Sequence, residues 1–565
     1  MLSCRRLPAW MASLLLIAGF GLPVAAQEST TRPAPKVPFA VINVASAERL
    51  LSDTEFLFQM IDRPDVFDFV KGLIGDRAGD LKGMDRTKPL GVMLFLESGL
   101  PPRPMPVTYV PASNMLQLMQ TFELGPVTPR KVSETRYEIE GLDFRGPDST
   151  QLAEFRDGYA IITASRELID AELPDPVEFN QALTSRYDIA ISLRIKSIPP
   201  ILRDVFLGFL RTQTQNELQR RNDEPEGAYR ARKAQGLNTL ESIEELLTQC
   251  DQFTIGWDGN QELRKGVLEL NIQAAPDSDY AKSLKDLAGR GSFFHVAQED
   301  EGKPLTVSIS WQMNKREKKT SLEMIEAARM EANRLLPEQM LDTTGANTLC
   351  DVLQATAEAG HLDGFVQVNS PSPGAFVVTG GLKLQGADAA STGLTQLLSE
   401  ISKAPDVKGL DLNVESHQGV NFHRIAPEGE DEGAQRFFGD QPAFWFGAGQ
   451  RALWFTVGAG EALPTLRDTM DAVLSSGPPP GGESTPFVLV FRQSPWMALQ
   501  RPEGENRRRD IGRELATEAF SSAGDALRVE TRPLENGIRT RVELDEGFLR
   551  WLALFLARQY DRSLL

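Results

Sequence analysis

The order in which strands and helices recur along the chain constrains its fold more than any single motif. Periodicity predicts a strand, two helices, two further strands and a helix, in that order, four times. The clearest copies occupy 188–287 and 487–559, and in both the second hairpin strand begins with glycine and a β-branched residue, at Gly266-Val267 and Gly537-Ile538. Consecutive hairpin strands of this kind pair into antiparallel sheets.

The other two copies, which begin at Phe39 and Leu305, are longer, because a further strand, hairpin and helix follow each of them. We therefore expect two halves of about 250 residues, each a long unit followed by a short one. A second alignment matches Lys88-Pro89-Leu90 to Lys303-Pro304-Leu305, and the sequence leaves this choice open. We expect an α+β fold of repeated units, with antiparallel sheets and helices packed on one face.

Turn-forming residues mark where one predicted segment ends and the next begins, above all in the Pro- and Gly-rich run 476–484. The predicted segments are, in chain order, a signal peptide at 1–26, a disordered leader at 27–38, a long unit at 39–180, a short unit at 181–290, a long unit at 291–475, a linker at 476–484 and a short unit at 485–565.

The first segment has the three parts of a secretory signal. Arg5-Arg6 supplies positive charge, 9–22 is almost wholly apolar, and Val24-Ala25-Ala26 supplies small residues for cleavage. We expect export to the periplasm or the cell exterior after cleavage near Ala26. The alternative is retention as an N-terminal anchor, because the apolar run is close to the length that spans a bilayer. No second long apolar run occurs, so we expect no membrane span in the mature chain.

The charge balance argues against one class of partner. The chain has 60 Lys and Arg against 78 Asp and Glu, a net charge of −18 that becomes −20 when Arg5 and Arg6 leave with the signal. Nucleic-acid binding needs clustered cations, so we expect no such partner. The acidity is interpreted as a solubility feature of the surface.

Local runs of like charge are expected to be solvated or paired within the chain. The acidic runs are 223–226, 298–301 and 428–432, for which calcium binding is an alternative, and the basic ones are 315–319 and 507–509.

The residues that bind metals or form disulfides are few. Cys250 and Cys350 remain in the mature chain, and their spacing allows either one disulfide or two buried thiols. His417 and His423 would share a face on a continuous strand, with Glu415 as the adjacent carboxylate. A zinc site wants a further ligand at favourable spacing, and none follows, so we expect no metal site.

Sequence motifs for catalysis or cofactor binding are also weak. Gly458-Ala459-Gly460 follows a predicted strand and precedes a helix, as a dinucleotide fingerprint does, but Leu463 stands at the third glycine position. We interpret these glycines as turn and cap residues, and we expect no cofactor. A P-loop and a G-x-S-x-G elbow are absent.

The apolar face of 546–559 is expected to be buried, with docking on a membrane or partner as the alternative. We name no catalytic, cofactor-binding or metal-ligating residue.

Several segments resemble known exported proteins. The stretch 137–141, the hairpin 155–163 and the helix that follows Ser165 resemble a family of uncharacterised secreted bacterial proteins, the DUF3352-like group. The region 419–472 resembles it more weakly, and 240–256 also looks like uncharacterised exported proteins. The resemblance implies export and a repeat fold, and it implies no catalytic residue.

Together these features predict an exported, non-catalytic scaffold or binding protein of the bacterial cell envelope, which binds a protein, a peptide or an envelope component. One alternative is a secreted hydrolase with carboxylates from separate strands, because such pairs leave no sequence signature. Another is a protein that binds lipid or another hydrophobic ligand between a curved sheet and its helices. The sequence leaves the oligomeric state open.

Overall fold

The computed structural model describes residues 37–97, 102–122, 128–140, 150–287, 291–298, 302–372, 375–404, 407–426, 429, 432–477, 485–497, 499, 507–521 and 523–563. The predicted signal peptide, nearly all of the leader and most of the 476–484 linker lie outside them. The chain forms two compact units. The N-terminal unit ends at Ile198 and includes Thr254–Asp258, and the C-terminal unit holds Pro199–Phe253 and the chain from Gly259 onward.

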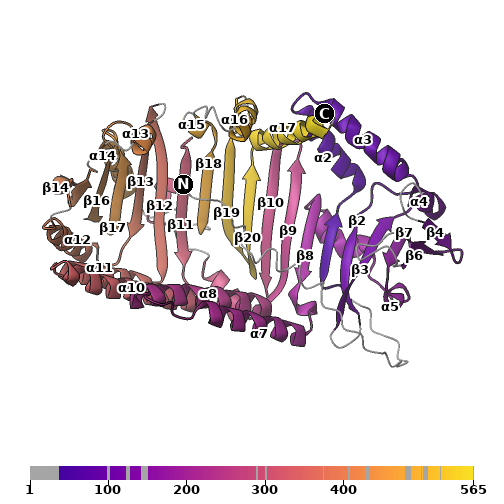
Figure 1. Ribbon diagram of the computed structural model, residues 1–565, viewed down its shortest axis with the longest axis horizontal. Coiled ribbons are helices and arrows are strands. Elements are labelled where there is room, and N and C mark those ends of the chain that lie inside the picture. Colours follow the sequence, from indigo (N-terminus) through magenta and orange to yellow (C-terminus); the bar gives the residue numbers. More distant parts are fainter. Residues whose placement is uncertain are drawn as a thin grey trace. The chain divides into compact units, whose positions relative to one another are not determined.

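Eight strands of the N-terminal unit form an antiparallel sheet (Figure 1). Their order is β8 (Ile189–Arg194), β1 (Ala40–Val44), β2 (Leu90–Glu97), β3 (Arg103–Pro111), β7 (Tyr159–Thr163), β6 (Thr150–Arg156), β5 (Arg136–Glu140) and β4 (Thr128–Lys131). The helices between them are α2 (Ala47–Gln59), α3 (Pro64–Ala78), η2 (Gly79–Leu81), α4 (Met115–Phe122), α5 (Arg166–Ile169), α6 (Pro176–Thr184) and η3 (Ile195–Ser197). The hydroxyl of Ser165 caps α5, as a Ser before a helix is expected to do.

Eleven strands of the C-terminal unit also pair antiparallel. Their order is β10 (Lys265–Ala274), β20 (Gly537–Leu544), β19 (Ala526–Leu534), β18 (Phe487–Arg492), β11 (Leu305–Gln312), β12 (His361–Ser372), β13 (Ala375–Lys383), β17 (Ala452–Gly458), β16 (Ala443–Gly449), β15 (Val420–Ile425) and β14 (Leu410–His417). The residues of β9 (Cys250–Asn260) are divided between the two units.

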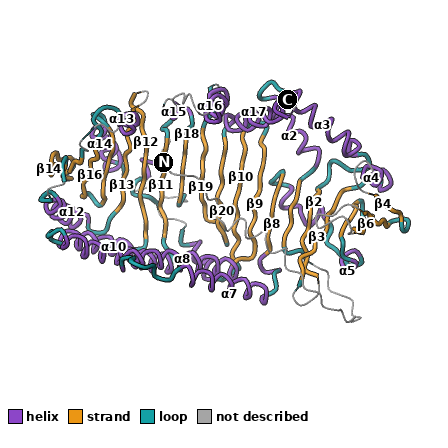
Figure 2. The backbone as a smooth tube through the Cα atoms, viewed as in Figure 1, coloured by secondary structure: helices purple, strands orange, loops and turns teal. Residues whose placement is uncertain are grey.

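Helices of the C-terminal unit connect these strands at their ends (Figure 2). They are α7 (Pro200–Glu217), α8 (Glu226–Gln249), α9 (Asp279–Lys285), η4 (His295–Gln298), α10 (Lys315–Glu338), α11 (Thr344–Ala359), α12 (Ala387–Ile401), α13 (Glu432–Phe438), α14 (Ala462–Ser475), α15 (Ser494–Met497), α16 (Arg507–Phe520) and α17 (Glu546–Ser563). Within the described ranges no helix is long and apolar enough to cross a membrane.

One strand order occurs in both units. The order β8-β1-β2-β3-β7-β6-β5-β4 in the N-terminal unit corresponds to β18-β11-β12-β13-β17-β16-β15-β14 in the C-terminal unit. Two helices follow β1 along the chain, α2 and α3, and two follow β11, α10 and α11. Here β1 corresponds to β11, whereas the alignment of Lys88-Pro89-Leu90 with Lys303-Pro304-Leu305 would match β2 with β11. The sequence repeat and its unit boundaries stay a prediction.

The predicted α+β class with antiparallel sheets is confirmed. We expected helices on one face, but they cover both faces of β16 and β17. Trp454 packs against Leu466 of α14, and Phe446 packs against Leu394 of α12. Gly447 is the register partner of Trp454, and neighbouring residues of a strand point to opposite faces, so these two clusters lie on opposite sides of the sheet. Each face of this region therefore has its own core.

Candidate functional site

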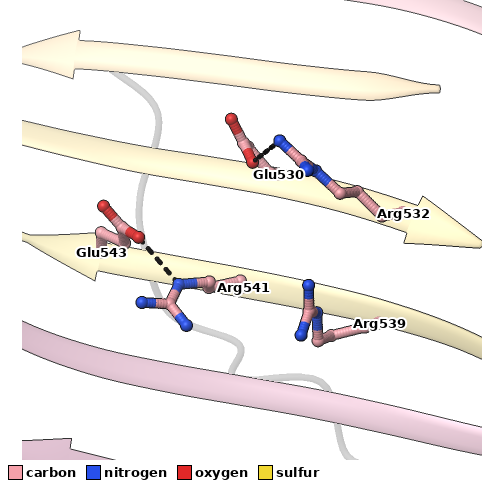
Figure 3. Close-up of a pocket in the computed structure, with 5 residues that line it drawn as sticks. All are labelled: Glu530, Arg532, Arg539, Arg541 and Glu543. Carbon is pink, nitrogen blue, oxygen red and sulfur yellow. Dashed lines mark hydrogen bonds and ion pairs between the residues drawn. The ribbon is translucent and has the colours of Figure 1, made fainter. Parts of the chain in front are cut away.

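A hollow of about 210 Å³ lies over β19 and β20 of the C-terminal unit (Figure 3). Every residue that lines it is charged, and the set is Glu530, Arg532, Arg539, Arg541 and Glu543. All five come from one hairpin, so the strand pairing alone brings them together.

The sequence of the hairpin explains why these charges share a face. From Arg528 to Arg532 and from Arg539 to Glu543, charged residues alternate with apolar residues or threonine. Successive side chains of a strand point to opposite faces, so every charged residue of each strand lies on the same face. A two-residue loop, Glu535-Asn536, joins the strands and fixes their register at Leu534 opposite Gly537.

Residues directly opposite each other on the hairpin form three rows of charge. The rows are Arg528 with Glu543, Glu530 with Arg541, and Arg532 with Arg539. Strand β10 continues the middle row, because Glu269 is the register partner of Arg541. Two rows therefore join opposite charges, and the third joins two like charges.

The carboxylates of this face are each held by arginine. Glu269 is only 3% exposed, and its Oε1 lies 3.0 Å from Nη1 of Arg541 and 3.9 Å from Nη1 of Arg539. Nε of Arg541 also donates to Oε1 of Glu543 at 2.7 Å. A buried carboxylate is strongly unfavourable without such partners, so these ion pairs are a condition of the local fold.

Glu530 is shared in the same way between two arginines. Nε of Arg528 donates to its Oε1 at 2.7 Å, and Nη2 of Arg532 lies 3.0 Å from its Oε2. Burial raises the pKa of the Glu530 carboxyl, but the hydrogen bonds and charges of Arg528 and Arg532 outweigh it, so the pKa lies below its ordinary value. Glu530 is therefore ionised at neutral pH.

This arrangement suits binding and not proton transfer. Arginine stays protonated at every physiological pH, and each carboxylate already accepts from an arginine. A general acid must hold a proton near neutral pH, and the lowered pKa of Glu530 does not suit that role. These residues were not among the candidates predicted from the sequence, although the alternation of charges between Arg528 and Glu543 was a usable signal.

The two histidines singled out from the sequence lie apart. His417 ends β14, and its Nε2 is 2.9 Å from Oδ1 of Asp471. His423 lies in β15, is 1% exposed and packs against the ring of Phe446. The hairpin turn between them places them on different strands, so their even spacing does not put them on one face. Glu415, the adjacent carboxylate, pairs with Arg467.

A serine and a histidine meet elsewhere in the C-terminal unit, but in a closed setting. Oγ of Ser310 is 3.0 Å from Nε2 of His361. The Ser310 side chain is 2% exposed, so a substrate has no access to its hydroxyl. Nearby Asp363 is also buried and accepts from Oγ of Ser292 at 2.6 Å. Asp363 thus holds the segment 291–298 on the sheet. With the Ser310 hydroxyl buried, these groups do not form a nucleophilic site.

Both cysteines are buried and free, so the structure contains two thiols and not a disulfide between them. Burial is the main cause that raises the pKa of the Cys250 thiol, to about 12, and burial also raises that of Cys350. Thiols in this state are poor nucleophiles.

The remaining sequence candidates have structural partners. Within the described ranges no three His, Cys, Asp or Glu side chains are placed to hold a metal ion.

In the acidic run 223–226, Glu224 accepts two hydrogen bonds from Arg232, which lower its pKa to about 2. Most of the other two acidic runs, and the side chains of 507–509, lie outside the described residues. In the basic run 315–319, Arg316 lies 3.5 Å from Glu245.

The glycine motif before α14 lacks the setting of a nucleotide site. The preceding strand, β17, is antiparallel to both of its neighbours, β13 and β16. A dinucleotide fingerprint requires a parallel strand–helix–strand unit. The predicted turn and cap roles hold only in part: Gly460 lies in a turn, but Gly458 is the last residue of β17 and pairs with Ala443, and the N-cap of α14 is Glu461.

The last helix buries only one side of its apolar face. Leu549, Ala553 and Leu554 are buried, whereas Trp551 and Phe555 are about 40% exposed and stack on each other. The expected burial therefore holds for part of α17.

Comparison with protein-family models, with curated proteins and with solved structures finds no match to this chain. The resemblance to secreted bacterial proteins stays a prediction.

Proposed function

We propose that this protein is an exported, non-catalytic binding protein of the bacterial cell envelope, which binds a protein, a peptide or an envelope component. The hollow over β19 and β20 is its binding site. The proposal includes the predicted internal repeat, which the shared strand order of the two units supports, and the predicted export, which rests on the N-terminal sequence.

The observation that carries the proposal is an open hollow lined only by arginine and glutamate, in which the carboxylates are already held by arginine. Such a surface recognises charge and geometry in a partner, because guanidinium forks donate in fixed directions. The alternative of a carboxylate hydrolase requires one carboxyl group that holds a proton and one that is free to act on water or substrate. Glu530, with its lowered pKa, cannot be that acid.

Fractionation and activity assays of the native strain and the purified protein test this proposal. We expect the chain in the envelope or culture supernatant, cleaved near Ala26, and bound to isolated envelope material. We expect no hydrolysis of peptide, ester or glycoside substrates. Hydrolysis that a single substitution abolishes, or a chain that stays in the cytoplasm, would overturn it.

A second candidate function, binding of a lipid or another hydrophobic ligand, is favoured by the opposite face of the same strands. There the side chains of Leu527, Val529 and Val542 are partly exposed, and Leu268 of β10 is 38% exposed. Large apolar surfaces of this kind are rarely left to water without a function. Native mass spectrometry of protein purified from its own host tests it: a co-purifying lipid supports this candidate, and its consistent absence contradicts it.

A further inference from the structure

Arg532 and Arg539 form the one row of the charged hairpin in which two cations face each other. Like charges directly opposite on adjacent antiparallel strands destabilise a sheet, since their Cβ atoms are only about 5 Å apart. The neighbouring rows avoid this cost by joining arginine to glutamate. A negatively charged group that binds between the two arginines would offset their repulsion. Such a group explains why this one row keeps two like charges.

The carboxylates nearby do not complete it. Glu530 is bound more closely by Arg528, at 2.7 Å, than by Arg532, at 3.0 Å. Glu269 is likewise closer to Arg541, at 3.0 Å, than to Arg539, at 3.9 Å. Arg532 pairs with Oε2 of Glu530 and Arg539 with Oε1 of Glu269, and each of these carboxylates also serves another arginine.

The pair is accessible to a ligand from solvent. The side chains of Arg532 and Arg539 are 47% and 28% exposed, and both line the hollow. Figure 3 shows them on neighbouring strands at the same end of the site, with Arg532 paired to Glu530 and Arg541 paired to Glu543. Two guanidinium groups offer planar forks of N–H donors, whose geometry matches the oxygens of a carboxylate or a phosphate.

We propose that Arg532 and Arg539 together bind one oxyanion, a carboxylate or a phosphate group carried by the partner. The inference rests on the proposed function, because it names the chemistry by which that binding site recognises its partner. The oxyanion accepts hydrogen bonds from both guanidinium groups and neutralises the row. Its affinity falls as salt is added, because the site is partly exposed to solvent.

Isothermal titration of the purified protein with inorganic phosphate and, separately, with acetate tests the site. We expect saturable binding of at least one of the two anions at low ionic strength. Arg532→Gln and Arg539→Gln should each weaken that binding at least tenfold, and Arg532→Lys, which keeps the charge but loses the fork, should weaken it less. The matched control is Arg130→Gln, another exposed cross-strand arginine, paired with Glu138, which should change binding less than twofold.

The source of the oxyanion is distinguished by a second pair of probes. An acidic peptide with a free C-terminal carboxylate is compared with its amidated form, and glycerol phosphate with glycerol. A loss of binding on amidation assigns a carboxylate, and binding of glycerol phosphate but not glycerol assigns a phosphate, and either result supports the site. Variants with unchanged melting temperature and circular dichroism qualify for the comparison.

Two results would overturn the inference: no oxyanion binds, or binding is the same in Arg532→Gln and Arg539→Gln as in the unaltered protein. Retention on envelope material separates this from the proposed function. Envelope binding together with either of these two results refutes the oxyanion site and leaves the proposed function standing. Oxyanion binding without any envelope binding supports the oxyanion site and refutes the proposed function.

Discussion

The two units build the same strand order from different side chains on the same face. Across β1, β2 and β3 of the N-terminal unit, the register partners Val41, Met93 and Val107 are all apolar and all buried. Across β11, β12 and β13 of the C-terminal unit, the corresponding row is polar and also buried, and it consists of Thr306, Gln367 and Thr379. The strand order therefore does not depend on an apolar row at this place.

The next row shows an exchange between glycine and an aromatic ring. In the N-terminal unit Gly91 of β2 lies opposite Tyr109 of β3, whose hydroxyl reaches over it. In the C-terminal unit Phe365 of β12 lies opposite Gly381 of β13. In both units a glycine on one strand makes room for an aromatic ring from the neighbouring strand. The glycine lies on β2 in the N-terminal unit and on β13 in the C-terminal unit.

The segments that cover these rows are held by different chemistry. Oη of Tyr109 donates to Oδ1 of Asn43 at 2.8 Å and accepts from Nδ2 of Asn180 in α6 at 3.2 Å, a network of neutral groups. In the C-terminal unit the carboxylate of Asp363 accepts from Oγ of Ser292 and from the backbone N–H of Phe293. The two units therefore share a strand order, but each uses a different buried polar group to hold the segment that covers its sheet.

The largest expected difference between the units comes from filling the two glycine positions. A Cβ at Gly91 would overlap the backbone carbonyl oxygen of Ile42 as well as the Tyr109 hydroxyl, whereas a Cβ at Gly381 meets only the rings of Phe294 and Phe365. Backbone yields less than a side chain. Gly91→Ala should cost about 3 kcal/mol or more and Gly381→Ala about 1–2 kcal/mol.

Thermal unfolding of both variants, with hydrogen exchange followed in β2 and β13, checks this order. Gly208→Ala, at a position with open space inside α7, is the control and should not destabilise the protein but stabilise it by up to about 1 kcal/mol. Equal losses at Gly91 and Gly381 would show that the two rings are equally constrained.

The second largest difference is expected at the polar groups that hold the covers. Asp363→Ala leaves the Ser292 hydroxyl and the Phe293 N–H without their acceptor in a buried site and should cost about 3 kcal/mol. Asn180→Ala removes one neutral hydrogen bond to Tyr109 and should cost about 1–2 kcal/mol. Hydrogen exchange at 291–298 and in α6 measures how far each covering segment is released from its sheet. A larger loss of stability in Asn180→Ala than in Asp363→Ala would contradict this predicted order.

Exchanging residue types between the polar and the apolar row gives a smaller effect. Val107→Thr buries a hydroxyl in an apolar row and should cost about 1–2 kcal/mol. Thr379→Val should change stability by less than about 0.5 kcal/mol, because the hydroxyl of its neighbour Thr456 keeps its bond to the carbonyl of Val378. Urea unfolding compares the two. A destabilisation by Thr379→Val as large as that by Val107→Thr would show that the polar row is essential to its sheet.

The smallest predicted effect concerns acid sensitivity. In β15 His423 is buried, and burial lowers its pKa below the ordinary 6.5, so the folded protein binds this proton less readily than the unfolded chain. Its contribution to stability is therefore complete above about pH 6.5 and is lost as pH falls through the lowered value. The corresponding strand β5 buries Tyr137 and Ile139 and contains no histidine. Hydrogen exchange at pH 7 and pH 5 should show β15 weakening more than β5, and His423→Gln should reduce that difference.

Local features of the fold were largely predictable from the sequence. Asp157-Gly158 is a typical turn sequence, and both residues have the positive φ angles that such a turn requires. Helix α10 begins at Lys315, ahead of its apolar periodicity, because its first turn is charged. The capping box formed by Asn314 and Glu317 was the signal for the earlier start.

Long-range pairing and the candidate site were not predictable in the same way. The pairs β10–β20 and β11–β18 join segments far apart in the chain, and no turn residue specifies them. Glu269 meets Arg541 only through the first of these pairs. The opposition of Arg532 and Arg539, in contrast, follows from the hairpin register and was open to prediction from the two-residue loop.

The most direct test of the account is a crystal structure of the protein grown with selenate, a tetrahedral oxyanion whose anomalous scattering locates it without ambiguity. The account predicts an anomalous peak within hydrogen-bond distance of the guanidinium groups of both Arg532 and Arg539, and its disappearance in the Arg532→Gln/Arg539→Gln variant. Peaks confined to other sites, or a peak that persists in the double variant, would contradict it.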